Sequence, residues 1–200
     1  MPDESESHRS LWKGRAKAGD ALGVATIESD GHYAFVGGAV VDTLKGGALW
    51  DSFDLSHGGA DVVTGAGGGD SFTVLTGAHD TFVYAAVSNS TGASHDTITN
   101  ADFDNDLFKV STISAVTGVD AAVTTGALNA ATFDANLASA VGTGQLTGHH
   151  ALLFTADSGD LSGHTFLVID ENGTAGYQAN ADLVIEIVNG TGTLVAGDFL

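Results

Sequence analysis

The sequence predicts a mainly β fold: a right-handed parallel β-roll or β-helix, followed by a β-rich C-terminal capping domain with one short helix. Three observations predict it. A nine-residue repeat occupies residues 37–83, strand-like apolar runs follow it, and a single segment has helical spacing. Repeats of this kind indicate stacked units that bury one continuous core.

The repeat consists of five units with Asp in the sixth place of each. One additional residue follows the second unit and another follows the fourth, so that equivalent edges recur every 19 residues. We therefore expect Asp42, Asp61 and Asp80 in one column, and Asp51 and Asp70 in a second. This spacing predicts a coil with two strands per turn.

Each unit combines a turn with a strand. The glycine-rich half can adopt the positive-φ turns that side chains disfavour, and the Asp-x-apolar half predicts a short strand with one inward side chain. The predicted inward residues are Leu44, Phe53, Val63, Phe72 and Phe82. A flexible Gly/Ser/Asp linker is the alternative, but a linker does not keep an acidic and an apolar register together.

The stacked turns are candidate cation sites. They place carboxylates and backbone carbonyls around the same point, which suits a hard cation with oxygen ligands, and calcium is the expected cofactor. The first predicted site lies between the Asp51 and Asp70 turns, and the second involves Asp61 and Asp80. The predicted ligand residues of the repeat are Asp51, Asp70, Asp61, Asp80, Asp42, Gly65, Gly67 and Gly69.

One unit carries a family resemblance. GAGGGDSFT, residues 65–73, resembles the consensus G-G-x-G-x-D-x-U-x of the RTX (hemolysin-type) calcium-binding repeats. The other units depart from it, since Val40 and Leu49 replace the third glycine and Ser56 opens the third unit. The resemblance implies a calcium-binding β-roll, although branched residues resist the positive-φ turn.

Composition agrees with an extracellular, calcium-rich setting. The chain has 25 acidic and 6 basic residues and a net charge of −19, so nucleic acid and anionic membrane are not expected partners. The 43% apolar content and ten phenylalanines favour a packed core over disorder. The absence of cysteine excludes disulfides and cysteine-based metal sites.

The repeat is flanked by two different segments. Residues 1–20 have mixed charge and no periodicity, which predicts a disordered tail or a misplaced start; residues 21–84 form the predicted RTX-like domain and residues 85–200 the C-terminal domain. No apolar export segment precedes the repeat, and no stretch is apolar and long enough to span a bilayer, so membrane insertion is not expected.

The C-terminal domain begins with an acidic run and one helix candidate. Asp102, Asp104 and Asp106 would share a face in a strand or converge on a cation in a loop, and an exposed acidic loop is favoured. Phe133 and Leu137 fall at helical spacing and predict a helix over 129–141. Its apolar face is expected to cap the open end of the coil.

Three apolar runs predict strands: 151–154, 165–169 and 183–188. Asp170, Asn172 and Asp182 lie between the last two. They could form a small calcium site or the hydrogen-bonded turn of a hairpin. An EF-hand is not expected, because Ala181 stands where that loop needs its bidentate Glu.

The order of segments from residue 80 to residue 200 resembles the bluetail domain, found at the C-terminus of bacterial surface proteins with RTX-type repeats. The segments include DTFVYAAVSNSTG, HALLFTADSGDLSGHTFLVIDENGTAGYQANADLVIEI and a final GDFL. The resemblance implies export and display at the cell surface. The acidic-apolar end resembles an uncleaved type I secretion signal, with a last short strand as the alternative.

No enzyme motif is present in the sequence: H-E-x-x-H and G-x-S-x-G are both absent. We therefore predict a non-catalytic secreted or surface protein whose coil folds on extracellular calcium. The expected partners are calcium ions, the type I secretion machinery, cell-surface polysaccharide and further copies of the chain. A calcium-independent structural or adhesive surface-layer module, or the detached tail of a secreted hydrolase, are the alternatives.

Overall fold

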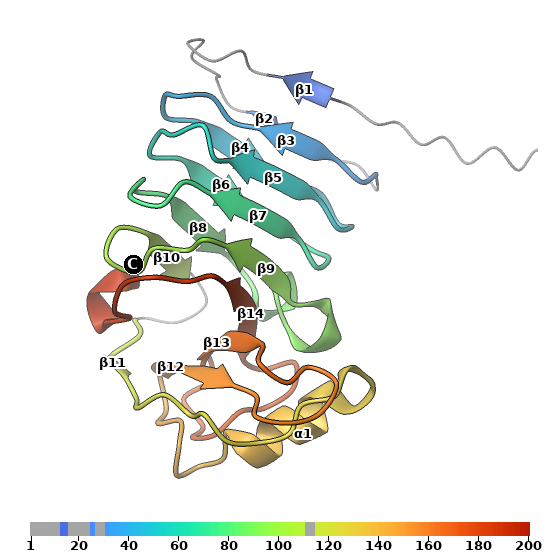
Figure 1. The fold of residues 1–200 in the computed structure, drawn as a ribbon, viewed down its shortest axis with the longest axis vertical. Coiled ribbons are helices and arrows are strands. Elements are labelled where there is room, and N and C mark those ends of the chain that lie inside the picture. Colours follow the sequence, from blue (N-terminus) through green and yellow to red (C-terminus); the bar gives the residue numbers. More distant parts are fainter. Residues whose placement is uncertain (1–12, 16–24, 27–30, 111–114) are drawn as a thin grey trace, which may run out of the picture.

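The computed structural model describes residues 13–15, 25–26, 31–110 and 115–200. Two β-sheets form the framework of the structure (Figure 1). The nine-stranded sheet has, in spatial order, β1 (Lys13–Arg15), β3 (Ala34–Val36), β5 (Ser52–Leu55), β7 (Ser71–Val74), β9 (Asp96–Thr99), β14 (Leu183–Val188), β13 (Thr165–Ile169), β12 (His150–Thr155) and β11 (Gly118–Val119). The five-stranded sheet has β10 (Leu107–Val110), β8 (Thr81–Tyr84), β6 (Val62–Thr64), β4 (Thr43–Lys45) and β2 (Ala25–Thr26).

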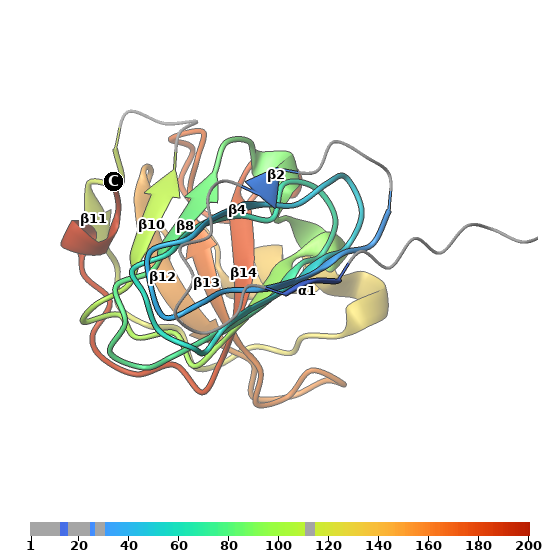
Figure 2. The ribbon, with the colours of Figure 1, turned by 90° about the horizontal axis from the view of Figure 1, so that it is seen from above.

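Successive strands from β2 to β10 alternate between the two sheets, and all pairs within this stack are parallel. Two consecutive strands and their turns therefore make one coil. Seen from above, the coils lie over one another (Figure 2). The register places Phe53 of β5 beside Phe72 of β7, a separation of 19 residues as predicted. The predicted class, mainly β with parallel sheets and one short α-helix, is confirmed.

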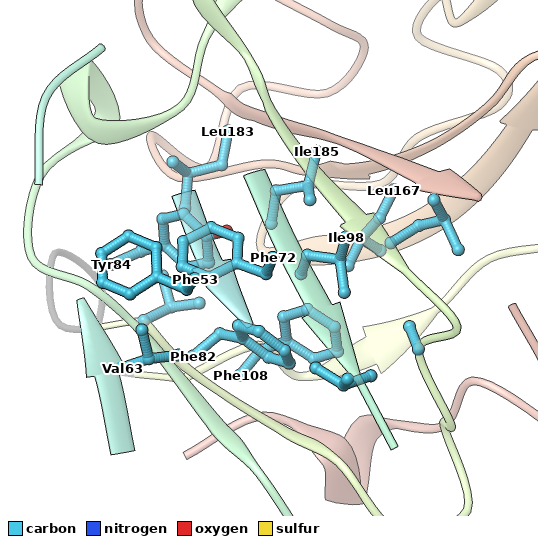
Figure 3. Close-up of a cluster of buried hydrophobic side chains, with 14 of the residues drawn as sticks. Phe53, Val63, Phe72, Phe82, Tyr84, Ile98, Phe108, Leu167, Leu183 and Ile185 are labelled. Carbon is cyan, nitrogen blue, oxygen red and sulfur yellow. The ribbon is translucent and has the colours of Figure 1, made fainter. Parts of the chain in front are cut away.

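The interior of the coils contains the predicted apolar column. All five predicted inward residues are buried, with exposed fractions of 2% or less. Aromatic rings stack along the column. The ring centroids of Phe35 and Phe53 are 4.6 Å apart, and those of Phe53 and Phe72, both labelled in Figure 3, are 4.8 Å apart. The additional Leu55 and Val74 are buried too, because each is the second inward side chain of a four-residue strand.

The stack extends past the last glycine-rich unit. β9 pairs with β7 and β10 with β8, so that both sheets continue beyond the predicted domain boundary at residues 84 and 85. The connection from β8 to β9 carries two 3-10 helices, η1 (Val87–Asn89) and η2 (Gly92–Ser94). Because of this longer connection, the coil repeat is 26 residues at this point in place of 19.

The C-terminal strands extend the nine-stranded sheet beyond β9. β14 lies parallel to β9, and β13 and β12 follow in antiparallel pairs. These strands are buried on both faces: Leu167 and Ile169 of β13 join the coil core, whereas Phe166 and Val168 join a second core. Their near-continuous apolar sequences reflect this two-sided burial.

The predicted helix is present as η3 (Ala130–Thr132) and α1 (Phe133–Ala140), but its expected position is wrong. Phe133 and Leu137 pack into the second core, so α1 does not cap the coil. β14 continues the sheet beyond β9, and its Ile185 lies in the coil core. The helix packs on the opposite face of these strands, because that face is also apolar.

Both ends of the described chain pair with strands of the stack. The predicted tail, residues 1–20, lies outside the described residues except for β1, which pairs with β3. At the other end, η4 (Ala196–Asp198) precedes Phe199, which forms an isolated parallel bridge with Phe108 in place of a full strand. Among the described residues, no helix has the length and apolar character needed to cross a membrane.

The turn glycines give a first prediction. Gly68 has φ +104°, and a Cβ there would lie 2.6 Å from backbone atoms of Leu49 and Trp50 in the preceding coil. Gly68→Ala is therefore expected to lower the free energy of unfolding by about 1–3 kcal/mol, measured by urea unfolding. Gly144→Ala is the control, because its Cβ would meet no atom within 4 Å; an equal loss in both variants would contradict the assignment.

Candidate cation sites in the aspartate columns

The five repeat aspartates form the two predicted columns along the stack. Each of them immediately precedes a strand, and all five have an exposed fraction of 0%. The column at the five-stranded sheet contains Asp42, Asp61 and Asp80, and the column at the nine-stranded sheet contains Asp51 and Asp70. Acid groups rarely occupy fully buried positions without a partner, so their hydrogen bonds are informative.

Each column is a ladder of hydrogen bonds between coils. The Asp42 N–H donates to Asp61 Oδ1 at 2.8 Å, and the Asp61 N–H donates to Asp80 Oδ1 at 2.9 Å. In the other column, the Asp51 N–H donates to Asp70 Oδ1 at 2.7 Å. One oxygen of each carboxylate in the later coil thus satisfies a buried backbone donor in the coil before it.

Sequence reasoning missed two members of these columns. Asp96 Oδ1 accepts the Asp70 N–H at 2.8 Å, and Asp106 Oδ1 accepts the Asp80 N–H at 3.1 Å. The prediction of an exposed acidic loop is wrong for Asp106 and Asp102, which are buried. The reason is local: Asp106 Oδ2 accepts the Asp102 N–H at 2.9 Å and closes a turn before β10.

Among the five aspartates, Asp51 has both carboxylate oxygens hydrogen-bonded: Oδ1 accepts the Tyr33 N–H and Oδ2 accepts the Gly47 N–H, each at 2.7 Å. Asp42 Oδ2 accepts the Gly38 N–H at 2.6 Å, but its Oδ1 is buried without a hydrogen-bond partner. Asp61, Asp70 and Asp80 each have a buried Oδ2 without a hydrogen-bond partner. Such buried oxygens are costly for a carboxylate unless a cation or a proton compensates the charge.

The first predicted site shows convergence of oxygen atoms. A methyl group placed on Gly46 would collide with Asp51 Oδ2 and would lie 2.6 Å from the carbonyl oxygen of Gly65. A methyl group on Gly65 would collide with Asp70 Oδ2. Gly46 thus leaves room for the Asp51 carboxylate and for the Gly65 carbonyl of the next coil, and Gly65 leaves room for the Asp70 carboxylate. This donor set fits the oxygen preference of calcium.

A similar arrangement occurs in the other column. A Cβ on Gly37 would lie 3.2 Å from Asp42 Oδ2 and 3.4 Å from Asp61 Oδ2.

The other predicted ligand glycines, Gly67 and Gly69, lie against neighbouring coils. The Gly67 N–H donates to the Gly47 carbonyl at 3.0 Å, and a Cβ on Gly69 would lie 2.9 Å from the His95 carbonyl. Gly67 and Gly69 therefore permit close approach of neighbouring coils, whereas the Gly65 carbonyl lies beside Gly46, near the Asp51 carboxylate.

The environment of the columns disfavours the charged form of their aspartates. Burial raises the pKa of Asp70 and of Asp80 to about 7 and that of Asp61 to about 6, with neighbouring aspartates adding to the effect. Burial also raises the pKa of Asp51. Within the described ranges, no lysine or arginine forms an ion pair with these acids.

A cation in the columns would need ligands besides side chains. In the part of the chain that the structure describes, no three His, Cys, Asp or Glu side chains gather as a metal cluster does. Backbone carbonyls and water would therefore have to complete the coordination. Calcium accepts such ligands readily, whereas zinc prefers side-chain nitrogen and sulfur.

A separate candidate site, that of Asp170, Asn172 and Asp182, lies in the connection from β13 to β14. Asp182 accepts the Glu171 N–H at 3.2 Å through Oδ1 and the Gln178 N–H at 2.6 Å through Oδ2. Asn172 Oδ1 accepts the Thr174 N–H at 2.6 Å. The hydrogen bonds expected for a hairpin turn are thus present. Glu171, which sequence reasoning did not select, is buried beside these residues.

Comparison with known proteins adds no assignment. The chain matches no family model, and no curated protein is similar to it. Interpretation of the columns therefore depends on their geometry and on the residues themselves.

Proposed function

We propose that the chain is a non-catalytic, calcium-binding protein, secreted or displayed at a bacterial surface. In this proposal the two-sheet stack is a right-handed parallel β-roll of the RTX type that folds on calcium. The observation that carries it is the close approach of the Asp51 and Asp70 carboxylates and the Gly65 carbonyl at the stacked turns, where Asp70 Oδ2 is buried without a hydrogen-bond partner.

The residues of the turns would act as follows. Asp51, Asp70 and the Gly65 carbonyl would hold the ion in one column, and Asp42, Asp61 and Asp80 would do so in the other. Bound calcium would neutralise the buried carboxylates and link adjacent coils. Because the site requires both coils in place, the free energy of binding becomes free energy of folding. Weak sites with calcium dissociation constants of about 10⁻⁴–10⁻³ M would fill outside the cell and stay empty in the cytosol.

The C-terminal part would serve export and display. The resemblance of residues 80–200 to the bluetail domain supports this role, and so does the resemblance of the final GDFL to type I secretion signals. The expected partners are accordingly the secretion machinery and, at the surface, polysaccharide or further copies of the chain.

One observation favours a second candidate, a calcium-independent structural or adhesive module. The aspartate ladder and the stacked aromatic column join the coils through the protein's own groups. In that case the coils would be a preformed scaffold for surface assembly.

A calcium titration distinguishes the two candidates. Metal-free protein would be titrated with calcium, and with magnesium as a control, while the far-UV circular dichroism is recorded. The proposal expects a calcium-specific gain of β signal that is lost in Asp51→Asn/Asp70→Asn and kept in Asp157→Asn, an exposed acid outside the coils. A fully folded metal-free spectrum that calcium leaves unchanged would reject the calcium switch and favour the scaffold.

A further inference from the structure

The acidic edge of the nine-stranded sheet continues beyond the coils. Asp51, Asp70 and Asp96 stand at the amino ends of β5, β7 and β9. Asp182 stands at the amino end of β14, which runs parallel to β9, and Asp170 follows the carboxyl end of β13, which runs antiparallel. Both acids therefore lie at the same edge of the sheet as the aspartate column. The connection that they bound, residues 170–182, is called the 170–182 loop below.

Glu171 is the residue of this loop that its hydrogen bonds do not explain. Its exposed fraction is 7%, and neither Oε1 nor Oε2 has a hydrogen-bond partner. Asp170 is fully buried, and its Oδ2 also lacks a partner. Three buried carboxylate oxygens thus remain unsatisfied on two adjacent residues. No lysine or arginine of the described chain forms an ion pair with either acid.

Asp170 Oδ1 and both Asp182 carboxylate oxygens fix the shape of the loop through hydrogen bonds to backbone N–H groups. Asp170 Oδ1 accepts the N–H groups of His149 at 3.1 Å and Gly173 at 2.5 Å. Asp182 accepts the Glu171 N–H and the Gln178 N–H, which brings both ends of the loop together. Burial, followed by the charges of Asp182 and Asp170, raises the pKa of Glu171 to about 7. The acids are fixed by the backbone, and the charge of Glu171 is left without compensation.

We propose that the 170–182 loop binds a divalent cation of the calcium class through the Glu171 carboxylate and Asp170 Oδ2. Backbone carbonyls and water would supply the other ligands, as calcium permits. The set contains only oxygen, which disfavours zinc and other metals that prefer nitrogen or sulfur. This inference depends on the proposed function only for the identity of the ion, and it does not require the coils to bind calcium.

The position of the loop indicates what a bound ion would do. The Tyr177 N–H donates to the Val141 carbonyl at 2.8 Å, and Tyr177 Oη donates to Asp134 Oδ1 at 2.6 Å, so that the loop is held against α1. Thr91 Oγ1 donates to the Asp182 carbonyl at 3.1 Å from the connection between η1 and η2. An ion in the loop would therefore fasten the β13–β14 hairpin between the helix and the last coils.

Hydrogen exchange followed by mass spectrometry tests this site separately from the coils. Peptides covering 170–182 and 51–74 would be compared in metal-free and calcium-loaded protein. Calcium at ten times the dissociation constant should slow exchange in the loop by about tenfold. Glu171→Gln should abolish this effect in the loop and leave the calcium response of the coil peptides unchanged. Asp157→Asn should behave as the unmodified chain.

The possible outcomes separate the two proposals. A loop that responds to calcium while the coil peptides do not would support the loop site and reject the coil proposal. A loop whose exchange is the same with and without calcium would overturn the loop site. Should Glu171→Gln fail to fold, the variant Asp51→Asn/Asp70→Asn provides the second test. In that variant, calcium must still slow hydrogen exchange in the 170–182 loop. Loss of the loop response in that variant would also overturn the inference.

Discussion

Metal-free protein is expected to lose stability as the pH rises from about 4 to about 7. The pKa of Asp70 and of Asp80 is raised from 3.8 to about 7, and that of Asp61 and of Asp106 to about 6. Across this window the folded chain keeps protons that the unfolded chain has released. The stability that these protonated carboxyl groups contribute is therefore fully present below their pKa in the unfolded chain. It is lost as the pH rises through their pKa in the folded chain.

Urea unfolding midpoints at a series of pH values from about 4.5 to about 8 would measure this effect. The midpoint should fall across the series without metal, and calcium should restore it at the high end, because the ion replaces the protons at the same carboxylates. Asp70→Asn/Asp80→Asn should flatten the metal-free profile. A metal-free midpoint that rises with pH would contradict the assignment of buried, unpaired acids.

Phe53→Ala is expected to lower the free energy of unfolding by about 3–5 kcal/mol. The Phe53 ring is 1% exposed and lies between those of Phe35 and Phe72, so alanine would leave a cavity in the middle of the aromatic column. Saturating calcium should not restore the lost stability, because the loss concerns packing and not charge.

Thermal unfolding of the calcium-loaded protein would measure the loss. Leu75→Ala is the matched control, since Leu75 is 46% exposed in a turn of the same stack and should change stability little. Equal effects of the two substitutions would show that the column is not the principal core of the coils.

The coil register could be predicted because two independent periodicities agree. The aspartates and the inward residues such as Leu44 and Val63 share one spacing, and a strand alternates its faces with a period of two. The additional Leu55 and Val74 could be located in the sequence, but their role as second inward side chains became clear only from the four-residue strands β5 and β7.

Predictions failed where a long connection interrupts the period. The segment with η1 and η2 changes the repeat from 19 to 26 residues, so Asp96 and Asp106 fall out of register in the sequence. The order of an acid followed by apolar residues was still visible at both positions. Glu171 had no comparable signal, because its burial depends on the antiparallel pairing of β13 with β14.

The aspartate ladder also gives the stack a polarity. Every backbone donor belongs to an earlier coil and every carboxylate acceptor to the next one, as in the bond from the Asp51 N–H to Asp70. Each coil thus serves as a template for the coil that precedes it in the chain. Growth from the C-terminal strands toward the N-terminal coils would meet a prepared acceptor at each step, whereas growth in the reverse direction would leave a buried donor unsatisfied until the next coil formed.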